Sequence, residues 1–231
     1  MAAARPGRSL DAHTSHPASS PDKLFAAAAD RNKEPILGAL QAWLPDDPSL
    51  PQHLLEVAAG TGQHAPFFTA RLGGRWAWHP TDADPASLAS MAAHAADCEG
   101  VAPPALLDVA ATPPAAWPRS PLQSGRWDAV FAANLTHISP WAATAGLLAG
   151  AAGCLRPGGR LILYGPFAVD GAPATPSDAA FHASLKASNP AWGYRDAAAE
   201  VVPAAAAAGL AWLATVPMPA NNFTLVFEKP K

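Results

Sequence analysis

The sequence contains only two cysteines, Cys98 and Cys154, among its 231 residues. They do not have the spacing of a metal site or a redox pair, so we expect two reduced thiols in a cytoplasmic protein. No apolar run reaches the roughly 20 residues needed to span a bilayer, so no membrane association is expected. Residues 1–21 lack the apolar stretch of a targeting peptide and are predicted to form a disordered tail.

Basic residues are also scarce. The chain has 15 lysines and arginines against 18 aspartates and glutamates, which gives a net charge of −3. This balance argues against direct binding to a phosphate backbone, and hence against a nucleic-acid-binding protein. Half of the residues are hydrophobic, and the chain is long enough for one substantial domain. We expect that domain to occupy residues 22–231, and its oligomeric state is not predicted.

The stretch that organises the chain is residues 54–65, with the sequence LLEVAAGTGQHA. Its apolar start predicts a buried parallel strand, and the residues after the glycines predict a helix that extends to Leu72. Gly60 and Gly62 have no Cβ atom, so the backbone can turn sharply there and lie against a ligand. The free N–H groups of the following helix point into the same space.

The carboxylate of Glu56 favours one kind of ligand. Dinucleotide enzymes also use a strand, a glycine-rich turn and a helix, but an acid at this position would repel a pyrophosphate. It would instead hold an ammonium group, such as that of S-adenosylmethionine. The segment therefore resembles motif I of the class I methyltransferases, usually Glu/Asp-x-Gly-x-Gly-x-Gly, with Ala58 in place of the first glycine and Gln63 after the last matched one. A nicotinamide-dependent Rossmann oxidoreductase and a glycine turn without a ligand are the alternatives.

Two further strands are predicted to end in acidic residues at the same edge of the sheet. The strand over residues 75–80 leads to Asp82, about 20 residues beyond the glycines, where an acid accepts hydrogen bonds from ribose hydroxyls. Asp84 is expected to cap the next helix. The strand over residues 104–107 leads to Asp108, which is expected either to meet the adenine amino group or to bond its own backbone in a turn.

A first helix is predicted over residues 23–44, capped by residues 21–22. Pro35 lies inside this pattern and implies a kink or a fresh start. Arg31 and Asn32 allow two interpretations. They belong either to a solvated helix face or to a lid that contacts the cofactor.

Strands and helices alternate along the rest of the chain, at residues 127–133, 141–155, 160–164, 197–208, 210–216 and 223–227. An insertion near 168–194 interrupts the alternation, and insertions at strand exits commonly build substrate pockets. The link between the last two strands is short, so this pair should be antiparallel. We therefore predict an α/β fold with a doubly wound seven-stranded sheet, mostly parallel with an antiparallel last strand. Such a terminal hairpin is expected in the Rossmann-like fold of class I methyltransferases.

Several segments together resemble one family, a group of methyltransferase-like proteins long filed as a domain of unknown function. These segments are the glycine loop and residues 31–36, 134–141, 164–167, 192–196 and 218–222. The resemblance covers about residues 24–228. It implies S-adenosylmethionine binding and indicates no particular substrate. His182 and Asn189 stand where acids are expected in such relatives, so acid chemistry from the insertion is not implied.

The candidate site lies at the carboxyl ends of the strands, where open α/β sheets bind ligands. His137 is the only histidine predicted at this edge, and acts either on the substrate or in loop hydrogen bonding. Tyr164 either orients the substrate or is a buried aromatic with a satisfied hydroxyl. The predicted cofactor contacts are Glu56, Gly60, Thr61, Gly62, Asp82, Asp108, Asn134, Arg31 and Asn32. The predicted acceptor contacts are Trp141, Phe167, Trp192, Asn221 and Asn222.

The acceptor is predicted to be a small molecule. Residues 134–137 read Asn-Leu-Thr-His, which is not the Asn/Asp-Pro-Pro-Tyr/Phe sequence of amino-methylating nucleic-acid enzymes. The acidic balance points the same way. The predicted function is S-adenosylmethionine-dependent methyl transfer to an oxygen, nitrogen or sulfur nucleophile, with no metal. A catalytically silent S-adenosylmethionine-binding protein is the alternative from another class.

Overall fold

The computed structural model describes residues 22–46, 51–122 and 124–231. The predicted tail over residues 1–21 lies outside the described residues. The helices are α1 (Ala27–Trp43), α2 (His64–Arg71), α3 (Ser87–Ala95), α4 (Trp141–Cys154), α5 (Pro176–Ser188) and α6 (Val202–Ala207). The strands are β1 (Gln52–Val57), β2 (Trp76–Asp82), β3 (Ala105–Leu106), β4 (Trp127–Ala133), β5 (Leu155–Pro166), β6 (Ala211–Met218) and β7 (Asn222–Glu228). Short helical turns cover Pro114–Ala116, Thr136–Ile138 and Ala197–Val201.

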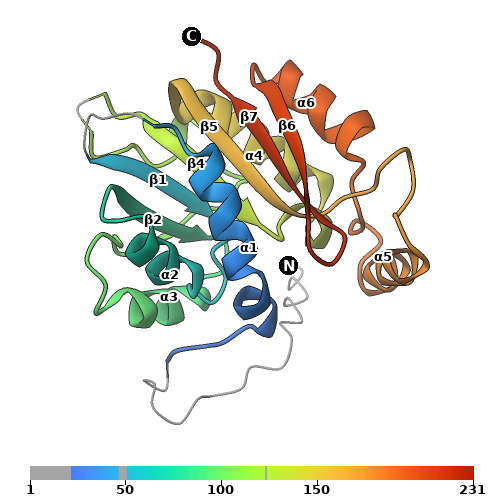
Figure 1. The fold of residues 1–231 in the computed structure, drawn as a ribbon, viewed down its shortest axis with the longest axis horizontal. Coiled ribbons are helices and arrows are strands. Elements are labelled where there is room, and N and C mark those ends of the chain that lie inside the picture. The colour runs from blue at the N-terminus through green and yellow to red at the C-terminus, as the bar shows by residue number, and fades with distance from the viewer. Residues whose placement is uncertain (1–21, 47–50, 123) are drawn as a thin grey trace, which may run out of the picture.

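The strands form one seven-stranded sheet in the order β3-β2-β1-β4-β5-β7-β6 (Figure 1). The pairs β1–β2, β1–β4, β2–β3 and β4–β5 are parallel. β7 lies between β5 and β6 and is antiparallel to both. The predicted doubly wound sheet with an antiparallel last strand is therefore confirmed. The strand order reverses between β1 and β4, and ligands of such sheets bind at the carboxyl ends next to a reversal.

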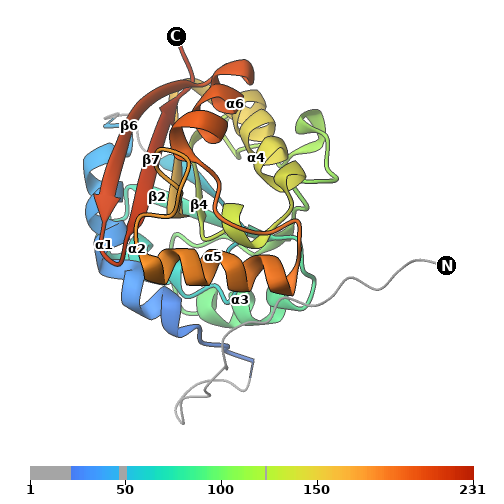
Figure 2. The same ribbon diagram turned by 90° about the vertical axis from the view of Figure 1, so that its right-hand side faces the viewer.

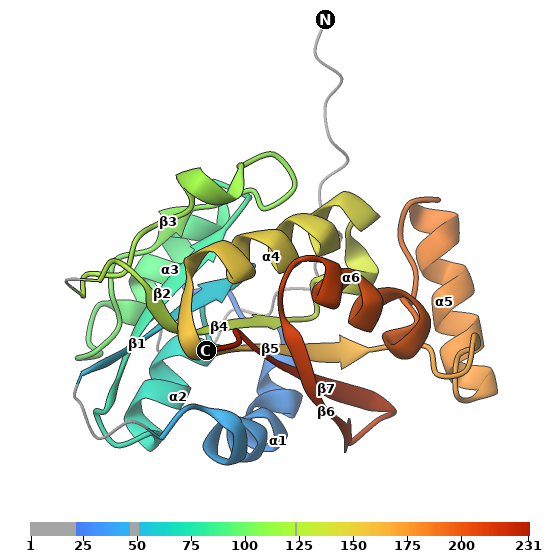
Figure 3. The same ribbon diagram turned by 90° about the horizontal axis from the view of Figure 1, so that it is seen from above.

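Helices cover both faces of the sheet. α1 and α2 lie on one face, and α4 and α6 lie on the other (Figure 3). β1 is buried along its whole length, as expected for a parallel strand covered on both sides. Its side chains alternate between the two cores, because Leu54 packs with α1 and α2 whereas Leu55 and Val57 pack with α4. Among the described helices, none combines the length and apolar character needed to cross a bilayer.

The first helix begins at Ala27, so the predicted start at residue 23 with a cap at residues 21–22 is wrong. The N-cap residue is Ala26, which has no side chain that could cap the helix. Its backbone N–H instead donates to Oε1 of Gln63, over 2.5 Å. Ala26 itself has an extended backbone, so the helix does not continue toward its N-terminal side. Pro35 lies inside α1, so it does not start a new helix.

Two other elements differ from the prediction. β5 begins at Leu155, five residues before the predicted start at residue 160, because Leu155 already pairs with Trp127 of β4. The predicted helix over residues 197–208 begins with a π-helical turn, in which the N–H of Val201 donates to the carbonyl of Asp196 over 3.0 Å. α6 follows directly after this turn.

The segment between β5 and the π-helical turn lies beyond the carboxyl end of β5. It contains α5, which sits beside the sheet rather than on either of its faces (Figures 1 and 2). The two ends of the segment lie side by side. The N–H of Ala168 donates to the carbonyl of Arg195 over 2.9 Å, and the N–H of Ala197 donates to the carbonyl of Ala168 over 3.1 Å. The segment therefore leaves the sheet and returns to it at one point.

Candidate functional site

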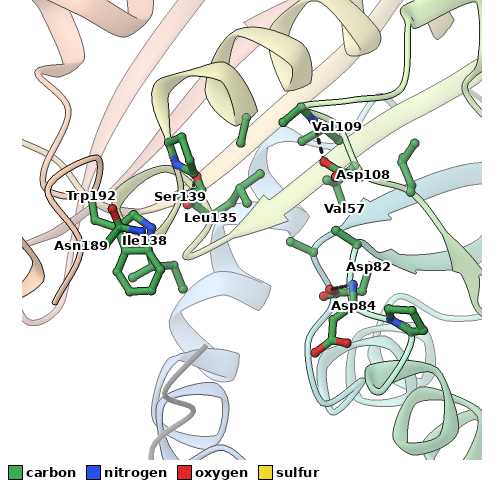
Figure 4. Close-up of a pocket in the computed structure, with 17 residues that line it drawn as sticks. Val57, Asp82, Asp84, Asp108, Val109, Leu135, Ile138, Ser139, Asn189 and Trp192 are labelled. Carbon is green, nitrogen blue, oxygen red and sulfur yellow. Dashed lines mark hydrogen bonds between the residues drawn. The ribbon is translucent and has the colours of Figure 1, made fainter. Parts of the chain in front are cut away.

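A pocket of about 480 Å³ opens at the carboxyl edge of the sheet, beside the reversal between β1 and β4 (Figure 4). One wall comes from the ends of β1, β2 and β3 and includes Val57, Asp82 and Asp108. The opposite wall comes from the turn after β4 and from the insertion, and includes Ser139 and Trp192. The volume falls within the range of roughly 300–1,000 Å³ that is typical of small-molecule sites.

The glycine loop has the left-handed backbone that its sequence predicts. Gly60 and Gly62 have φ values of 61° and 85°, and Ala58 has a φ of 58°. A Cβ atom at Gly62 would come within 2.6 Å of the Cα of Met91, so packing against α3 requires glycine there. At Gly60 no atom lies within 4 Å of the added Cβ. Ala58 lines the pocket and takes the conformation that a glycine normally adopts.

Asp82 supports this loop from the end of β2. It is fully buried, and its two carboxylate oxygens accept the N–H groups of Gly60 and Asp84, each over 2.9 Å. A carboxyl oxygen can accept more than one hydrogen bond, so Asp82 can hold the loop and also bind ribose hydroxyls. Asp84 lines the pocket as well, and its carboxylate accepts the N–H of Ala86 in the turn before α3. The ribose contact of Asp82 stays a prediction.

Asp108 begins a turn after β3. Its carboxylate accepts the N–H of Ala110 over 3.0 Å, and its carbonyl accepts the N–H of Thr112 over 2.8 Å. Asp108 also lines the pocket. Asp108 can therefore hold the turn and also contact adenine. The adenine contact stays a prediction.

Glu56 points away from the pocket. Nε1 of Trp78 donates to one of its carboxylate oxygens over 2.7 Å, and Nδ1 of His64 lies 3.8 Å from the other. Burial raises the pKa of Glu56 to about 7. Side chains alternate along a strand, so Glu56 faces α1 and α2 whereas Val57 faces the pocket. The predicted contact of Glu56 with an ammonium group stays a prediction.

A buried polar network continues from His64 to α1 and β5. Nε2 of His64 lies 2.9 Å from Oδ1 of Asn32, and the side chain of Asn32 also influences the pKa of Tyr164. Burial lowers the pKa of His64 to about 4 and raises that of Tyr164. Asn32 and Tyr164 do not line the pocket, and Arg31 is exposed. The cofactor contacts predicted for Arg31 and Asn32 stay predictions.

Thr61 forms hydrogen bonds that stabilise the glycine loop. Its hydroxyl donates to Oε1 of Gln63 over 2.9 Å, and its carbonyl accepts the hydroxyl of Ser90 over 2.7 Å. Thr61 is buried and does not contribute to the pocket lining. Its predicted cofactor contact stays a prediction.

His137 lies in the 3₁₀ turn that follows β4 and is 5% exposed. Its Nδ1 has no hydrogen-bond partner among the described residues. Burial, and secondarily the charge of Arg195, lower the pKa of His137 to about 4, so the imidazole is neutral at pH 7. A Cβ atom at Gly165 would lie 3.7 Å from both His137 Nδ1 and Asn134 Oδ1, so both atoms face the end of β5. The pocket lining includes the adjacent Ile138 but neither His137 nor Asn134.

Among the five residues predicted to contact the acceptor, Trp192 lines the pocket and the other four do not. Phe167 is 1% exposed in the core beneath α4. Trp141 is 37% exposed at the start of α4. Asn221 has a φ of 56°, and the amide of Asn222 donates to two carbonyls of the same turn, so both residues shape the β6–β7 connection. The acceptor contacts of these four residues stay predictions.

The sequence reasoning missed three residues that the structure brings to this site. Ser139 and Asn189 line the pocket. Arg195 donates to the carbonyls of Thr136 and Ser139. The available signal was the position of Asn189 and Arg195 in or beside the insertion, where the sequence predicts a substrate pocket.

Comparison with known proteins identifies the family. Residues 23–229 match the family described as "Protein of unknown function (DUF938)". The chain belongs to the DUF938 family. The matched residues include every part of the pocket and the inserted segment of this DUF938 protein. The suspected membership of a methyltransferase-like family of unknown function is therefore confirmed.

Several solved structures of similar fold are described as methyltransferases. An O-methyltransferase family 2 protein from Planctomyces limnophilus in complex with apigenin has a TM-score of 0.69 at 20% identity, over 88% of this chain and 58% of that protein. Human N-acetylserotonin methyltransferase in complex with SAM has a TM-score of 0.66 at 14% identity, over 88% of this chain and 53% of that protein. This chain thus spans little more than half of either protein.

A third similar structure has a comparable length. It is the complex between the Haloferax volcanii Trm112 methyltransferase activator and a putative methyltransferase, with a TM-score of 0.66 at 15% identity. The similarity covers 88% of this chain and 92% of the matched one. These likenesses establish the class I methyltransferase fold that the sequence predicts.

Proposed function

We propose that this protein transfers a methyl group from S-adenosylmethionine to a small-molecule acceptor. One observation carries the proposal: a single pocket at the strand-order reversal joins Asp82 and Asp108 to the insertion, which contributes Trp192. The aspartates suit the ribose and adenine of the donor. The wall with Trp192 is mainly apolar and suits a small organic acceptor.

The ligands seen in similar solved structures support the same donor and acceptor classes. Human N-acetylserotonin methyltransferase is seen with SAM, and PigF is seen with SAH. The Planctomyces limnophilus protein is seen with apigenin, which is a small molecule.

When bound, S-adenosylmethionine supplies an electrophilic methyl group. The remaining task of the chain is to align an oxygen, nitrogen or sulfur nucleophile with it. A neutral nucleophile must also lose a proton, and we propose His137 as its acceptor. Its imidazole is neutral, and its Nδ1 is buried without a partner among the described residues. We propose that Tyr164 orients the substrate, which Tyr164→Phe would test in the same assay.

Turnover with labelled donor tests the function. The protein is incubated with radiolabelled S-adenosylmethionine and a metabolite extract, and we expect label in a small product. Calorimetry with S-adenosylmethionine and with NAD in parallel tests the cofactor. Tight binding of NAD without binding of S-adenosylmethionine would contradict the proposal and favour a Rossmann oxidoreductase.

The role of His137 is tested by His137→Ala. If His137 is the base, turnover should fall by about 10²- to 10⁴-fold while the affinity for the donor holds. If it only positions the substrate, the Michaelis constant should change more than turnover. His53→Gln is the matched control, because His53 lies near the start of β1, far from the carboxyl edge. A near-normal rate in His137→Ala would contradict the catalytic role.

A catalytically silent S-adenosylmethionine-binding protein is the second candidate. The observation that favours it is that His137 and Tyr164 do not line the pocket. This candidate predicts donor binding in calorimetry without transfer of label to any compound in the extract. Transfer of label by the wild-type protein would exclude it.

A further inference from the structure

Arg195 lies where the end of the insertion meets the turn after β4. Its Nε donates to the carbonyl of Thr136 over 3.2 Å. Its Nη2 donates to the carbonyls of Ser139 and Ala191, each over 2.8 Å. One guanidinium group therefore joins carbonyls from two segments that are far apart in the sequence.

The segments that Arg195 joins carry the acceptor side of the site. The turn carries His137, and its neighbour Ser139 lines the pocket. The insertion contributes Trp192 to the same wall. The backbone is joined at this point as well, since the N–H of Gly193 donates to the carbonyl of His137 over 2.9 Å. A shift of one segment relative to the other would therefore change the shape of the acceptor wall.

The geometry of these contacts suits arginine and does not suit lysine. A guanidinium group carries five N–H donors in a fixed plane, and three of them are used here. A lysine ammonium carries the same charge at one point on a flexible stem. Lysine at this position would keep the charge near His137 but could not hold three carbonyls in fixed directions.

We propose that Arg195 is a positioning residue for the methyl acceptor, because it fixes the turn after β4 against the insertion and so sets the acceptor wall of the pocket. The term acceptor rests on the proposed function, whereas the fixed wall does not depend on it. None of the contacts described for Arg195 involves Asp82 or Asp108, the two aspartates proposed to bind S-adenosylmethionine. Removal of Arg195 should therefore leave the affinity for S-adenosylmethionine intact.

Arg195→Lys tests the proposal with the compound that receives label in the extract assay. The Michaelis constant for that compound should rise about 10- to 100-fold, because small displacements of positioning groups have effects of this size. The turnover number should change much less, and the dissociation constant of S-adenosylmethionine should not change. An unchanged Michaelis constant, or an equal loss of donor affinity, would overturn the proposal.

Arg126→Lys is the matched control. Nη1 of Arg126 donates to the carbonyl of Gly153 over 2.7 Å, at the end of α4 remote from the pocket. The substitution therefore also removes an arginine–carbonyl contact, but it should leave the acceptor Michaelis constant unchanged. A similar rise of the acceptor Michaelis constant in both variants would show that any lost arginine–carbonyl contact has this effect. That result would overturn the proposal.

Hydrogen exchange separates failure of this proposal from failure of the proposed function. If the wild-type protein methylates nothing, the exchange rate of the Gly193 amide still reports whether the two segments are held together. It should rise at least about tenfold in Arg195→Lys and not in Arg126→Lys. An unchanged rate would overturn the proposal.

A second variant covers the case in which Arg195→Lys fails to fold. In Arg195→Ala, millimolar guanidinium ion should restore the slow exchange of the Gly193 amide, since the free ion can occupy the vacated site. The same concentration should not affect Arg126→Ala. Absence of any restoration would overturn the proposal.

Discussion

Ala58 holds a backbone conformation that is unfavourable for alanine and neutral for glycine. Its φ of 58° lies in the left-handed region, where the Cβ atom comes too close to the carbonyl oxygen. We expect Ala58→Gly to raise the free energy of unfolding by about 1 kcal/mol, because it removes this strain. Urea denaturation monitored by tryptophan fluorescence would measure the change.

Ala206→Gly is the control for this prediction. Ala206 lies in α6 and is exposed, so glycine there should lower the free energy of unfolding by about 1 kcal/mol through its poor helix propensity. Equal losses in the two variants would show that Ala58 is not strained.

Asp82 is the residue on which donor binding should depend most. Asp82→Ala removes the ribose hydrogen bonds and also the acceptor for the N–H of Gly60. We expect calorimetry to show a loss of about 1–3 kcal/mol in binding free energy for S-adenosylmethionine. Asp84→Ala is the comparison, because Asp84 lines the same pocket from the exposed turn before α3. A larger loss in Asp84→Ala would transfer the ribose contact to that residue.

At the scale of elements, the segment before α1 is tied to the glycine loop. The N–H of Leu24 donates to the hydroxyl of Ser90, which donates in turn to the carbonyl of Thr61. The N–H of Ala26 donates to Gln63, at the other end of the loop. A ligand that makes the glycine loop more rigid should therefore also make the segment before α1 more rigid.

Donor binding is expected to slow hydrogen exchange over residues 22–36. A ligand that orders the glycine loop should also reduce opening of the amides of Leu24 and Ala26, because their acceptors belong to the loop or bond to it. Exchange with and without S-adenosylmethionine would test this, with α6 as an internal control. Unchanged exchange over residues 22–36 would contradict both the coupling and the predicted lid.

At the scale of the whole molecule, buried titratable groups should make stability depend on pH. His64, His79 and His137 have pKa values lowered from 6.5 to about 4, so the folded protein resists their protonation and loses stability as the pH falls from 6.5 toward 4. Glu56 acts in the opposite direction. Its pKa is raised from 4.5 to about 7, so its contribution falls as the pH rises through that range.

The three histidines outweigh the single glutamate where the ranges overlap. We therefore expect the free energy of unfolding to be greatest near pH 7 and to fall by about 2–3 kcal/mol on acidification to pH 5. Urea titrations at pH 5, 7 and 8 would measure it. Glu56→Gln should raise stability at pH 8 and make the loss between pH 7 and 5 steeper. A profile that does not change in Glu56→Gln would contradict the buried-acid contribution.

Local patterns in the sequence were sufficient for most of the fold. Apolar runs identified β1 and β4, the apolar stretch from Trp141 identified α4, and the short link before β7 made the last pair antiparallel. These features depend on the periodicity of neighbouring residues and on chain length. The placement of Asp82 and Asp108 at one edge followed as well, because parallel strands deliver their carboxyl ends to the same side.

Tertiary structure decided which side chains meet at that edge. Glu56 and Val57 are adjacent in sequence, yet strand alternation sends them to opposite faces of the sheet. The turn between β6 and β7 uses the left-handed backbone of Asn221 and the hydrogen bonds of the Asn222 amide. Arg195 reaches the carbonyls of Thr136 and Ser139 across the insertion. Sequence periodicity carries no information about contacts between such distant segments, because these depend on how the insertion packs on the finished sheet.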